Sequence, residues 1–398
     1  MPTIHDAFEH HKQGRLEKAE AVYQQLLAAA PGDSDALHYF GVLRMSQGRR
    51  DEAIDLVTRA LKIAPLNPDA WNSLGNMVAA TGKPNAPEYA FKRALELKPD
   101  YLEAWYNLGN HYRRHRRREE ALNCFRRVLD LNPRITGAYE NCAMLLHRMG
   151  RPEEANAAFK AWHAADPDNP IARHMALAYA HEAPPRADDA YVVKMFDKMS
   201  GYFDESLGRL GYAAPALLSV AVAEFIPYAE GRLVVLDAGC GTGLCGPLLR
   251  SSARRLVGVD LSSGMLARAR ERAVYDELHE GELVAFMAAH PAAFDLVLSA
   301  DTLVYFGPLE AAFAAAASTL KPGALFAFTL EAEPADSTEK HRLHPHGRYS
   351  HGAAYVRDCL AAAGFELLQL EDGVLRKETG ADVHGHVTIA RKKSLPGQ

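Results

Sequence analysis

The sequence predicts two domains of different class: an all-helical repeat array, followed by an α/β domain built on a mostly parallel sheet. The array is predicted by prolines that recur every 34 residues from Pro31 to Pro167. The α/β domain is predicted by an apolar run, residues 233–236, that leads into Asp237 and then three glycines at alternate positions. A second apolar run ends in Asp260, as expected for neighbouring parallel strands whose carboxyl ends share one sheet edge.

Composition restricts the classes of partner. The 398 residues are 48% hydrophobic and 24% charged, and their net charge is −5. No basic module for nucleic acid is indicated, and no apolar run approaches the ~18 residues of a membrane span. The first residues lack the basic and apolar segments of a signal peptide, so we expect a cytoplasmic protein. Five cysteines without a Cys-x-x-Cys pair predict neither a disulfide framework nor a zinc site.

The repeat keeps a fixed pattern within each 34-residue period. Glycines stand at 14, 48, 82 and 150, alanines at 19, 53, 121 and 155, and aromatics at Tyr23, Phe91, Phe125 and Phe159. Trp71-x-x-Leu74-Gly75 and Trp105-x-x-Leu108-Gly109 occupy the first helix of two repeats. The pattern resembles the tetratricopeptide repeat from about residue 3 to residue 167. With a capping helix near residues 171–181, it predicts a repeat domain over residues 1–183.

Two positions depart from the repeat. Arg116 occupies a glycine position, and Pro87 occupies an alanine position. Proline loses little in the first turn of a helix, where the N–H groups have no helical partner. We therefore expect the second helix of the third pair to start late.

Amide side chains recur in the first helices of the repeats. The resemblance places Asn76, Asn107 and Asn110 in the concave groove, like the asparagine ladder of the O-linked N-acetylglucosamine transferase repeats. An amide donates and accepts at once, so such a ladder can hold an extended peptide. These residues are the predicted binding site for a protein or peptide partner. The alternative is that they are ordinary asparagines of a generic repeat.

A proline-containing break at residues 182–187 marks the start of the second domain, residues 184–398. A helical lid is expected over residues 188–210. Within it, Phe196-Asp197 and Phe203-Asp204 repeat the same aromatic–acid pair seven residues apart. The segment resembles the N-terminal cap of many small-molecule methyltransferases, with Tyr202 or Phe203 closing over the cofactor. The alternative is that these aromatics only pack the lid on the domain.

The glycine stretch has two competing interpretations. Residues 241–246 fit the G-x-G-x-x-G pattern of a dinucleotide site, with Asp260 near the expected distance. However, Asp237 stands directly before the loop, where a carboxylate repels a pyrophosphate. The stretch instead resembles motif I and the acidic loop of class I S-adenosylmethionine-dependent methyltransferases, whose ligand carries an ammonium and a sulfonium. A strand–glycine–helix turn that binds nothing is a third possibility.

This resemblance assigns a role to each cofactor residue. Gly239, Gly241 and Gly243 carry the amino-acid end, and Asp237 holds its ammonium, through water. Asp260, followed by Leu261, takes the ribose hydroxyls. Met265 packs on adenine, and Glu282 with Leu283, at the end of the third strand, binds its edge; Glu280 is the alternative. Ser299, in the fourth strand, is also expected to contact the cofactor.

The remaining strands are expected at residues 294–301, 324–331, 365–370 and 386–391. A turn is expected at residues 321–323, and a helix at 353–363. The resemblance implies a Rossmann-like, seven-stranded, mostly parallel sheet in the order 3-2-1-4-5-7-6, following the superhelical array.

A polar loop at residues 339–351 contains four histidines. Its spacing is not that of metal ligands, so no metal is expected. The loop instead is expected to pass over the substrate pocket. His351 or Tyr349 is a candidate proton acceptor, since histidine titrates near neutrality. Arg342 or Arg348 is a candidate for binding a carboxylate bidentately, and Tyr349 and Arg348 are the predicted substrate contacts. Tyr305, in the loop after the fourth strand, is a second catalytic candidate. An ordinary polar loop is the alternative.

The combined prediction is a methyltransferase that acts on a protein or peptide recruited by the array. A small-molecule methyltransferase that uses the array for assembly or localisation is the first alternative. A scaffold with a relic cofactor domain and an oxidoreductase on the same sheet are the others.

Overall fold

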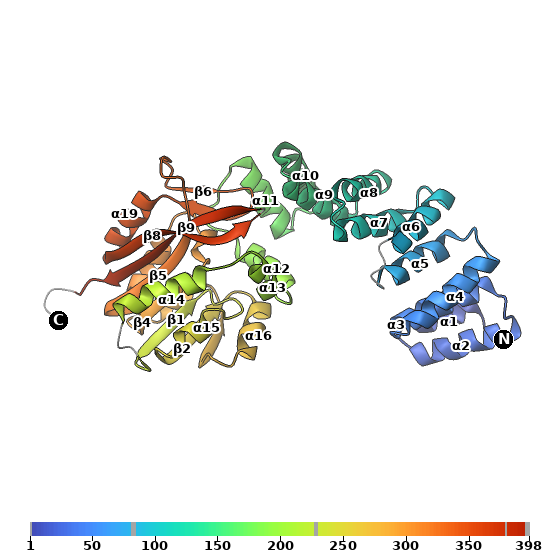
Figure 1. Cartoon of the computed structure of the whole chain (residues 1–398), viewed down its shortest axis with the longest axis horizontal. Helices are drawn as coiled ribbons and strands as arrows, with labels where there is room; N and C mark the ends of the chain where they lie inside the picture. The colour runs from blue at the N-terminus through green and yellow to red at the C-terminus, as the bar shows by residue number, and fades with distance from the viewer. Residues whose placement is uncertain (1, 81–84, 227–229, 379, 395–398) are drawn as a thin grey trace. The chain divides into compact units, whose positions relative to one another are not determined.

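A computed structural model of the chain describes residues 2–80, 85–226, 230–378 and 380–394. It divides into two compact units, Met1–Asp166 and Pro167–Gln398 (Figure 1). The sequence placed this division between residues 183 and 184. The segment that was predicted to cap the array, now helix α11 (Pro170–Ala180), packs instead within the second unit.

The first unit is a succession of antiparallel helix pairs. Its helices are α1 (Ile4–Lys12), α2 (Leu16–Ala29), α3 (Ser34–Ser46), α4 (Arg50–Ile63), α5 (Pro68–Ala79), α6 (Asn85–Leu97), α7 (Leu102–Arg114), α8 (Arg118–Leu131), α9 (Thr136–Arg148) and α10 (Pro152–Ala165). The predicted helical repeat array is thus confirmed.

The periodic residues explain where these helices begin and end. Each second helix, from α2 to α10, ends two residues before its periodic proline, which cannot continue a helix. Where they are described, at 14, 48, 116 and 150, the glycine positions connect the two helices of a pair with a left-handed residue. Gly48 has φ +78°, and Arg116, which replaces glycine, adopts φ +59°. Helix α6 carries Pro87 in its first turn, as expected.

Small residues in the first helix of a pair make room for large residues in the second. A Cβ at Gly75 would lie 2.5 Å from the ring of Phe91, and one at Gly109 would lie 3.0 Å from the ring of Phe125. The aromatic position is fully buried at Tyr23. Because the helices of a pair approach this closely, buried apolar clusters form between successive helices of the array.

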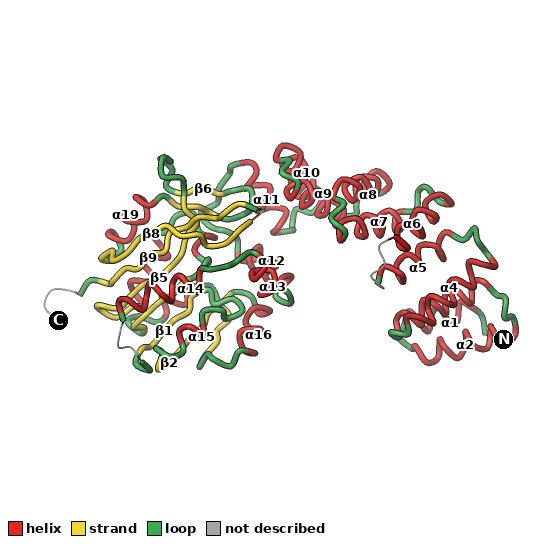
Figure 2. The backbone as a smooth tube through the Cα atoms, in the orientation of Figure 1, coloured by secondary structure: helices red, strands yellow, loops and turns green. Residues whose placement is uncertain are grey.

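The second unit contains the α/β domain (Figure 2). Its further helices are α12 (Asp189–Met199), α13 (Phe203–Arg209), α14 (Ala214–Phe225), α15 (Gly246–Leu249), α16 (Ser263–Glu271), α17 (Leu283–Ala289), η1 (Leu303–Tyr305), α18 (Glu310–Thr319) and α19 (Ala353–Ala362). Its strands are β1 (Leu233–Ala238), β2 (Ala253–Asp260), β3 (Glu277–Glu280), β4 (Phe294–Ser299), β5 (Leu320–Ala332), β6 (His341–Leu343), β7 (Tyr349–His351), β8 (Phe365–Glu378) and β9 (Ala381–Lys392).

The sheet has the predicted order in its main body. Strands β3, β2, β1, β4 and β5 are parallel neighbours, β9 pairs antiparallel with β5, and β8 pairs with β9. The predicted sixth and seventh strands are β8 and β9, so this is the predicted order 3-2-1-4-5-7-6. The addition is a short hairpin, β6–β7, which extends the end of β5 through Glu331 and Ala332. The predicted polar loop is therefore partly a sheet element.

Helices cover both faces of the sheet. Along β1, Val234 and Leu236 pack with α17, α18 and α19, whereas Val235 packs with α14 and α15. Buried parallel strands are apolar on both faces for this reason. Within the described part of the chain no single helix is long and apolar enough to cross a membrane; one bent pair, α13 with α14, meets the test by length and composition.

Helix α11 joins the lid and the hairpin at one point. His174 on α11 bonds the Gly347 carbonyl through Nε2 at 2.9 Å, and its ring stacks on Tyr191 of α12 at 3.9 Å. A Cβ at Gly347 would lie 2.6 Å from the Tyr191 hydroxyl. Ala178 of α11 also packs with Leu343 and Tyr349 of the hairpin. Three elements that are separate in sequence thus form one packed junction.

Candidate functional site

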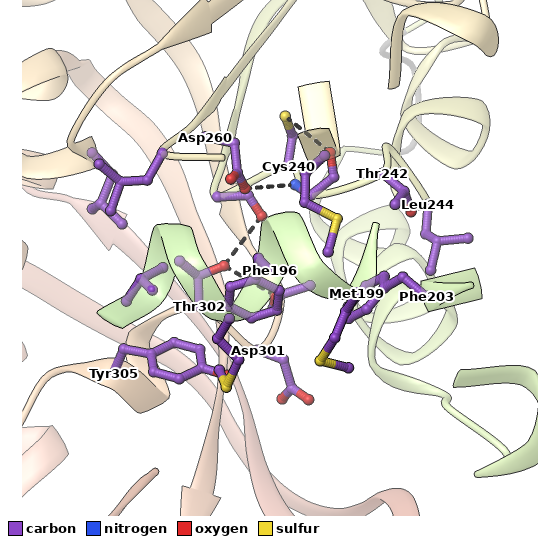
Figure 3. Close-up of a pocket in the computed structure, with 18 of the residues that line it drawn as sticks. Phe196, Met199, Phe203, Cys240, Thr242, Leu244, Asp260, Asp301, Thr302 and Tyr305 are labelled. Carbon is purple, nitrogen blue, oxygen red and sulfur yellow. Dashed lines mark hydrogen bonds between the residues drawn. The ribbon is translucent and has the colours of Figure 1, made fainter. Parts of the chain in front are cut away.

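A cavity of about 310 Å³ lies between the carboxyl ends of β1, β2 and β4 and the helices α12 and α13 (Figure 3). This is where ligands bind in open α/β sheets. Its lining includes Val192, Met195, Phe196, Met199 and Phe203 from the lid, Gly239, Cys240, Gly241 and Thr242 after β1, Asp260, Leu261 and Met265 around β2, Gly281, Glu282 and Leu283 after β3, and Asp301, Thr302 and Tyr305 after β4.

The glycine loop after β1 has no room for side chains at two of its glycines. Gly239 (φ +79°) lies so close to Thr302 that a Cβ would sit 2.2 Å from the threonine hydroxyl. A Cβ at Gly243 would lie 2.8 Å from Tyr275. Gly241 has φ +54°, lines the cavity, and has open space where its Cβ would be. The loop backbone is therefore free to contact a ligand at Gly241.

Asp260 fixes this loop. Its Oδ2 accepts the Gly241 N–H at 2.8 Å, and its Oδ1 accepts the Ser262 N–H at 2.9 Å. Burial raises the pKa of this carboxyl, although the two backbone N–H groups act against the increase. Each carboxylate oxygen has a further lone pair, so Asp260 can hold the loop and still accept hydroxyl groups from the cavity.

Asp237 lies beneath the loop, outside the cavity lining. It is 1% exposed, and its Oδ2 accepts the Tyr275 hydroxyl at 2.7 Å. Its Oδ1 is buried and has no hydrogen-bond partner among the described residues. Burial raises the pKa of Asp237 to about 7, against the lowering effect of Tyr275. An orphaned carboxylate oxygen at this depth fits a ligand that brings a positive charge.

Glu282 was predicted to end the third strand, but it forms the N-cap of α17. Its carboxylate accepts the Ala285 N–H at 2.7 Å and lies 3.4 Å from the Arg186 guanidinium. Leu283 is the first residue of that helix, and both residues line the cavity. Glu280, the alternative, is exposed on β3. Met265 is buried and lines the cavity beside them.

The two aromatic–acid pairs of the lid have parallel roles. Asp197 accepts the Ser262 hydroxyl at 2.5 Å and the Gly264 N–H at 3.1 Å, at the start of α16. Asp204 accepts the Thr242 hydroxyl at 2.5 Å, in the glycine loop. We call these contacts the two latches. The rings of Phe196 and Phe203 meet edge-to-face at 5.7 Å and close the cavity (Figure 3).

Several predicted residues lie elsewhere. Tyr202 is the N-cap residue of α13 and is 50% exposed, whereas Phe203, the first residue of the helix, lines the cavity. Ser299 is buried and donates to the Ala238 carbonyl at 2.9 Å, which ties β4 to β1. Tyr349 is fully buried, and its hydroxyl donates to the Pro184 carbonyl at 2.5 Å. Ser299 and Tyr349 thus have structural contacts in place of the ligand contacts that were expected.

His351 is not placed to act on a substrate in the cavity. It is fully buried in β7, where Nε2 lies 3.0 Å from the Gly307 carbonyl, and burial lowers its pKa to about 4. Tyr305, the second catalytic candidate, does line the cavity, with its ring 5.7 Å from that of Phe196. Burial raises the pKa of Tyr305 to about 12, which leaves its hydroxyl neutral.

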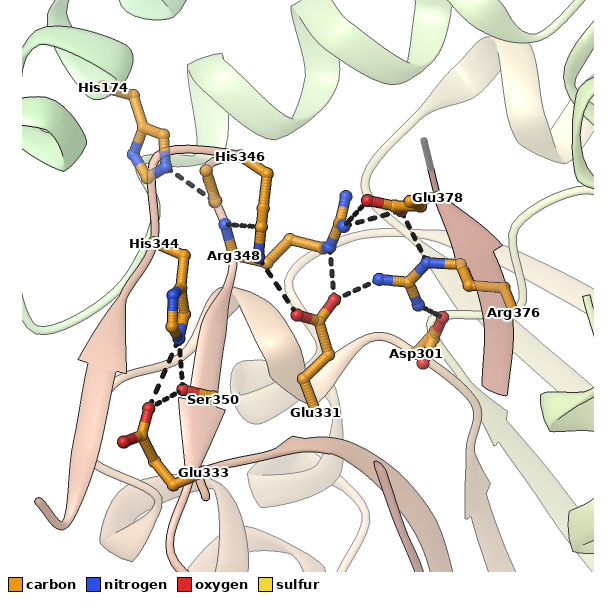
Figure 4. Close-up of polar contacts among 11 residues, drawn as sticks. His174, Asp301, Glu331, Glu333, His344, His346, Arg348, Ser350, Arg376 and Glu378 are labelled. Carbon is orange, nitrogen blue, oxygen red and sulfur yellow. Dashed lines mark hydrogen bonds and ion pairs between the residues drawn. The ribbon is translucent and has the colours of Figure 1, made fainter. Parts of the chain in front are cut away.

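Arg348 does line the cavity, together with residues that were given no role from the sequence. Asp301, Arg376 and Glu378 complete this side of the wall, and Glu331 lies behind them (Figure 4). Asp301 lies two residues after the end of β4 and has φ +54°, rare for a residue with a side chain. Its position after a strand at the ligand edge was the available signal. Arg376 and Glu378 lie beyond the predicted end of the sixth strand.

The groove asparagines of the array differ in exposure. Asn107 donates to Asn72 at 3.0 Å, one contact in a series between first helices that also includes His38–Ser73. Each of these pairs is 35 residues apart in sequence. Asn76 is exposed, and Asn110 is half-buried and accepts from Arg113 at 3.3 Å. Asn107 therefore contributes to the array itself, while Asn76 faces solvent.

Known families match both units. Residues 235–323 match a model described as a methyltransferase domain, and residues 10–77 and 102–135 match models of the tetratricopeptide repeat. The α/β fold is that of class I methyltransferases.

Similar proteins match parts of the chain. Methyltransferase-like protein 27 of Homo sapiens is 33% identical over 25% of this chain and 40% of its own length. A malonyl-[acyl-carrier protein] O-methyltransferase of Pectobacterium atrosepticum is 33% identical over 36% of this chain and 53% of its own length. The [4+2]-cyclase SpnF is 20% identical, with a TM-score of 0.44, over 53% of this chain and 98% of that one. The chain spans between a quarter and about half the length of the first curated relatives. The chain thus joins an array of tetratricopeptide repeats to a domain that matches a methyltransferase family model.

Proposed function

We propose that the second unit is a methyltransferase that uses S-adenosylmethionine and releases S-adenosylhomocysteine. The observation that carries the proposal is a glycine loop that follows the buried Asp237 and is bonded by the half-buried Asp260. A dinucleotide would bring a pyrophosphate toward Asp237, which Coulomb repulsion disfavours. A ligand with an ammonium and a sulfonium, and without a phosphate, fits an acid at this position.

The residues present fit this cofactor part by part. Asp260 accepts the ribose hydroxyls with its remaining lone pairs, and the Gly239–Gly241 backbone meets the amino-acid end. Met265 and Leu283 offer apolar contact to adenine. The buried Oδ1 of Asp237 faces no protein donor among the described residues and suits an ammonium, directly or through water. When bound, the cofactor supplies a methyl group on a positively charged sulfur, and the chain's part is to orient it and exclude water.

Ligand-dependent stability tests this proposal. S-Adenosylhomocysteine at a hundred times its dissociation constant should stabilise the full chain by about 2.7 kcal/mol. Asp260→Ala should abolish most of that stabilisation, because it removes charge-assisted bonds of about 1.5–3 kcal/mol each. Asp336→Ala, at an exposed acid, is the matched control. Stabilisation by a nicotinamide dinucleotide alone would contradict the proposal.

We further propose that the methyl acceptor is carried on a protein or peptide that the array recruits. The support is the array itself, whose concave face is the usual binding surface of such repeats, and the exposed Asn76 on a first helix. The Pectobacterium relative is also named for a group held on a carrier protein.

Full-chain variants separate this proposal from the small-molecule alternative. Asn76→Ala combined with Asn110→Ala should raise the Michaelis constant for a protein substrate and leave cofactor affinity unchanged. Asn123→Ala, at an exposed amide on the second helix of its pair, should change neither. If the groove pair leaves the Michaelis constant unchanged, the array does not recruit the substrate, and a small-molecule acceptor is favoured.

A further inference from the structure

Five charged side chains form one connected group, and four of them stand in the wall of the cavity. We call Asp301, Glu331, Arg348, Arg376 and Glu378 the charge cluster (Figure 4). Arg376 bonds Asp301 at 2.5 Å and Glu378 at 2.7 Å, and it also bonds Glu331. Arg348 bonds Glu331 at 2.5 Å and Glu378 at 2.7 Å. All except Glu331 line the cavity.

The charge cluster has an excess of negative charge. It holds three carboxylates and two guanidiniums, so its net charge is −1 (two minus three). The adjoining His346 contributes no cation near neutral pH, because burial and then the Arg348 charge lower its pKa to about 3. The remaining arginine of the lining, Arg186, pairs with Asp189 at 2.8 Å and with Glu282. A negatively charged acceptor would therefore meet guanidiniums that already form ion pairs with carboxylates. A cation, in contrast, would neutralise the excess negative charge of the charge cluster.

The acids of the charge cluster are not equivalent. Burial would raise the pKa of Glu331, but the charges of Arg348 and Arg376 lower it to about 2. Burial likewise opposes these arginines at Glu378, whose pKa is lowered. At Asp301 burial prevails over Arg376, and the pKa is raised. Asp301 is thus the member that most readily takes up a proton.

Asp301 is also the member closest in the chain to the cofactor loop. Its neighbour Thr302 donates to the Gly239 carbonyl at 3.2 Å. The Asp301 N–H donates to the Thr329 hydroxyl at 2.9 Å, which fixes the residue in its left-handed conformation. The rings of Phe196, Tyr212 and Tyr305 also line the cavity, and those of Phe196 and Tyr305 lie 5.7 Å apart. Aromatic faces attract ammonium ions, so the wall and the charge select the same ligand.

We infer that the methyl acceptor is an amine, which docks as its ammonium ion in the charge cluster and gives a proton to Asp301. This inference rests on the proposed function and names the acceptor class for that site. The amine nitrogen loses its proton to the Asp301 carboxylate and forms a bond to the methyl carbon with the freed lone pair. The carbon–sulfur bond breaks, and its electron pair stays on sulfur. The methylated ammonium product leaves, and the proton passes from Asp301 to water.

A matched pair of simple probes tests the docking step. The full chain saturated with S-adenosylhomocysteine is titrated with n-butylammonium or with butyrate at equal ionic strength, and its melting temperature is followed. We expect stabilisation by n-butylammonium only, and loss of that effect in Asp301→Asn but not in Asp336→Asn. Equal or greater stabilisation by butyrate, or no effect of n-butylammonium, would overturn the inference.

The chemical form of the product tests the transfer step. The full chain is incubated with methyl-labelled S-adenosylmethionine and proteins of its own organism's lysate. The label should resist mild alkali, which hydrolyses methyl esters, and should disappear when the lysate amines are acetylated beforehand. Label on an alkali-labile ester or on acetylated proteins would refute the amine while the cofactor proposal stands. Failure of S-adenosylhomocysteine to bind would instead refute the proposed function.

Asp301→Asn separates proton transfer from folding. We expect about a hundredfold lower turnover near pH 7 with unchanged S-adenosylhomocysteine affinity, and partial recovery at higher pH, where the amine deprotonates without help. A role in folding alone would show no such recovery. Wild-type pH dependence in the variant would therefore overturn the role of Asp301, and the two probes above still decide the acceptor class if the variant is unstable.

Discussion

Cofactor binding should release a proton from Asp237. In the free protein this carboxyl is buried, with a pKa of about 7. At pH 6 the protonated fraction is therefore ~0.9. A ligand that places an ammonium near the orphaned Oδ1 favours the ionised form, so full ionisation on binding corresponds to release of ~0.9 proton. At pH 8 the carboxyl is already mostly ionised, and the release should fall to ~0.1.

Calorimetry measures this release directly. S-Adenosylhomocysteine carries the same ammonium, and its binding heat at pH 6 should differ between buffers of different ionisation enthalpy. Asp237→Asn should remove the difference, while Asp336→Asn should keep it. A wild-type binding heat that is independent of the buffer, or an equal buffer dependence in Asp237→Asn, would refute the placement of the ammonium beside Asp237.

Three further predictions follow from local geometry and pKa. The folded pKa of Asp237 lies above its ordinary value of 3.8, so the stabilising contribution of this group is lost as pH rises from about 4 through about 7. Between these pH values the unfolding free energy of Asp237→Asn should rise, relative to that of the wild type, by up to about 4 kcal/mol. Denaturant titration without ligand measures this difference. Gly239→Ala should destabilise the chain by about 2–5 kcal/mol through its left-handed φ and its clash with Thr302, whereas Gly32→Ala, with open space at its Cβ, should change little in the same assay. Asp204→Asn weakens one latch and should speed S-adenosylhomocysteine dissociation several-fold in stopped-flow measurements; an unchanged rate would show that the lid does not limit release.

The repeat and the main sheet were predictable because each depends on a pattern within the chain. Prolines at a fixed period mark the ends of successive second helices. An acid after an apolar run marks the carboxyl end of a strand, as at Asp260 in β2. The glycine positions were predictable for the same reason, and Arg116 adopts the conformation of the glycine it replaces.

The acceptor end of the site was harder to predict because it depends on contacts between distant segments. The sequence favoured His351, since histidine titrates near neutrality, but the β6–β7 hairpin buries that ring within the sheet. Arg376 reaches the cavity only because β8 continues past its predicted end at residue 370 and pairs along β9. Its partners Asp301 and Glu331 are 75 and 45 residues away in sequence. Charge pairing over such separations leaves no local signal.

The junction of α11 with the lid and the hairpin makes this helix part of the framework of the second unit. That unit begins at Pro167, and α11 is its first helix. His174 contacts Gly347, whose neighbour Arg348 belongs to the charge cluster, and Tyr191, which belongs to the lid helix. One side chain, His174, thus contacts both the segment that carries the charge cluster and the helix that covers the cavity. A fragment of the second unit that begins after α11 would lose both contacts.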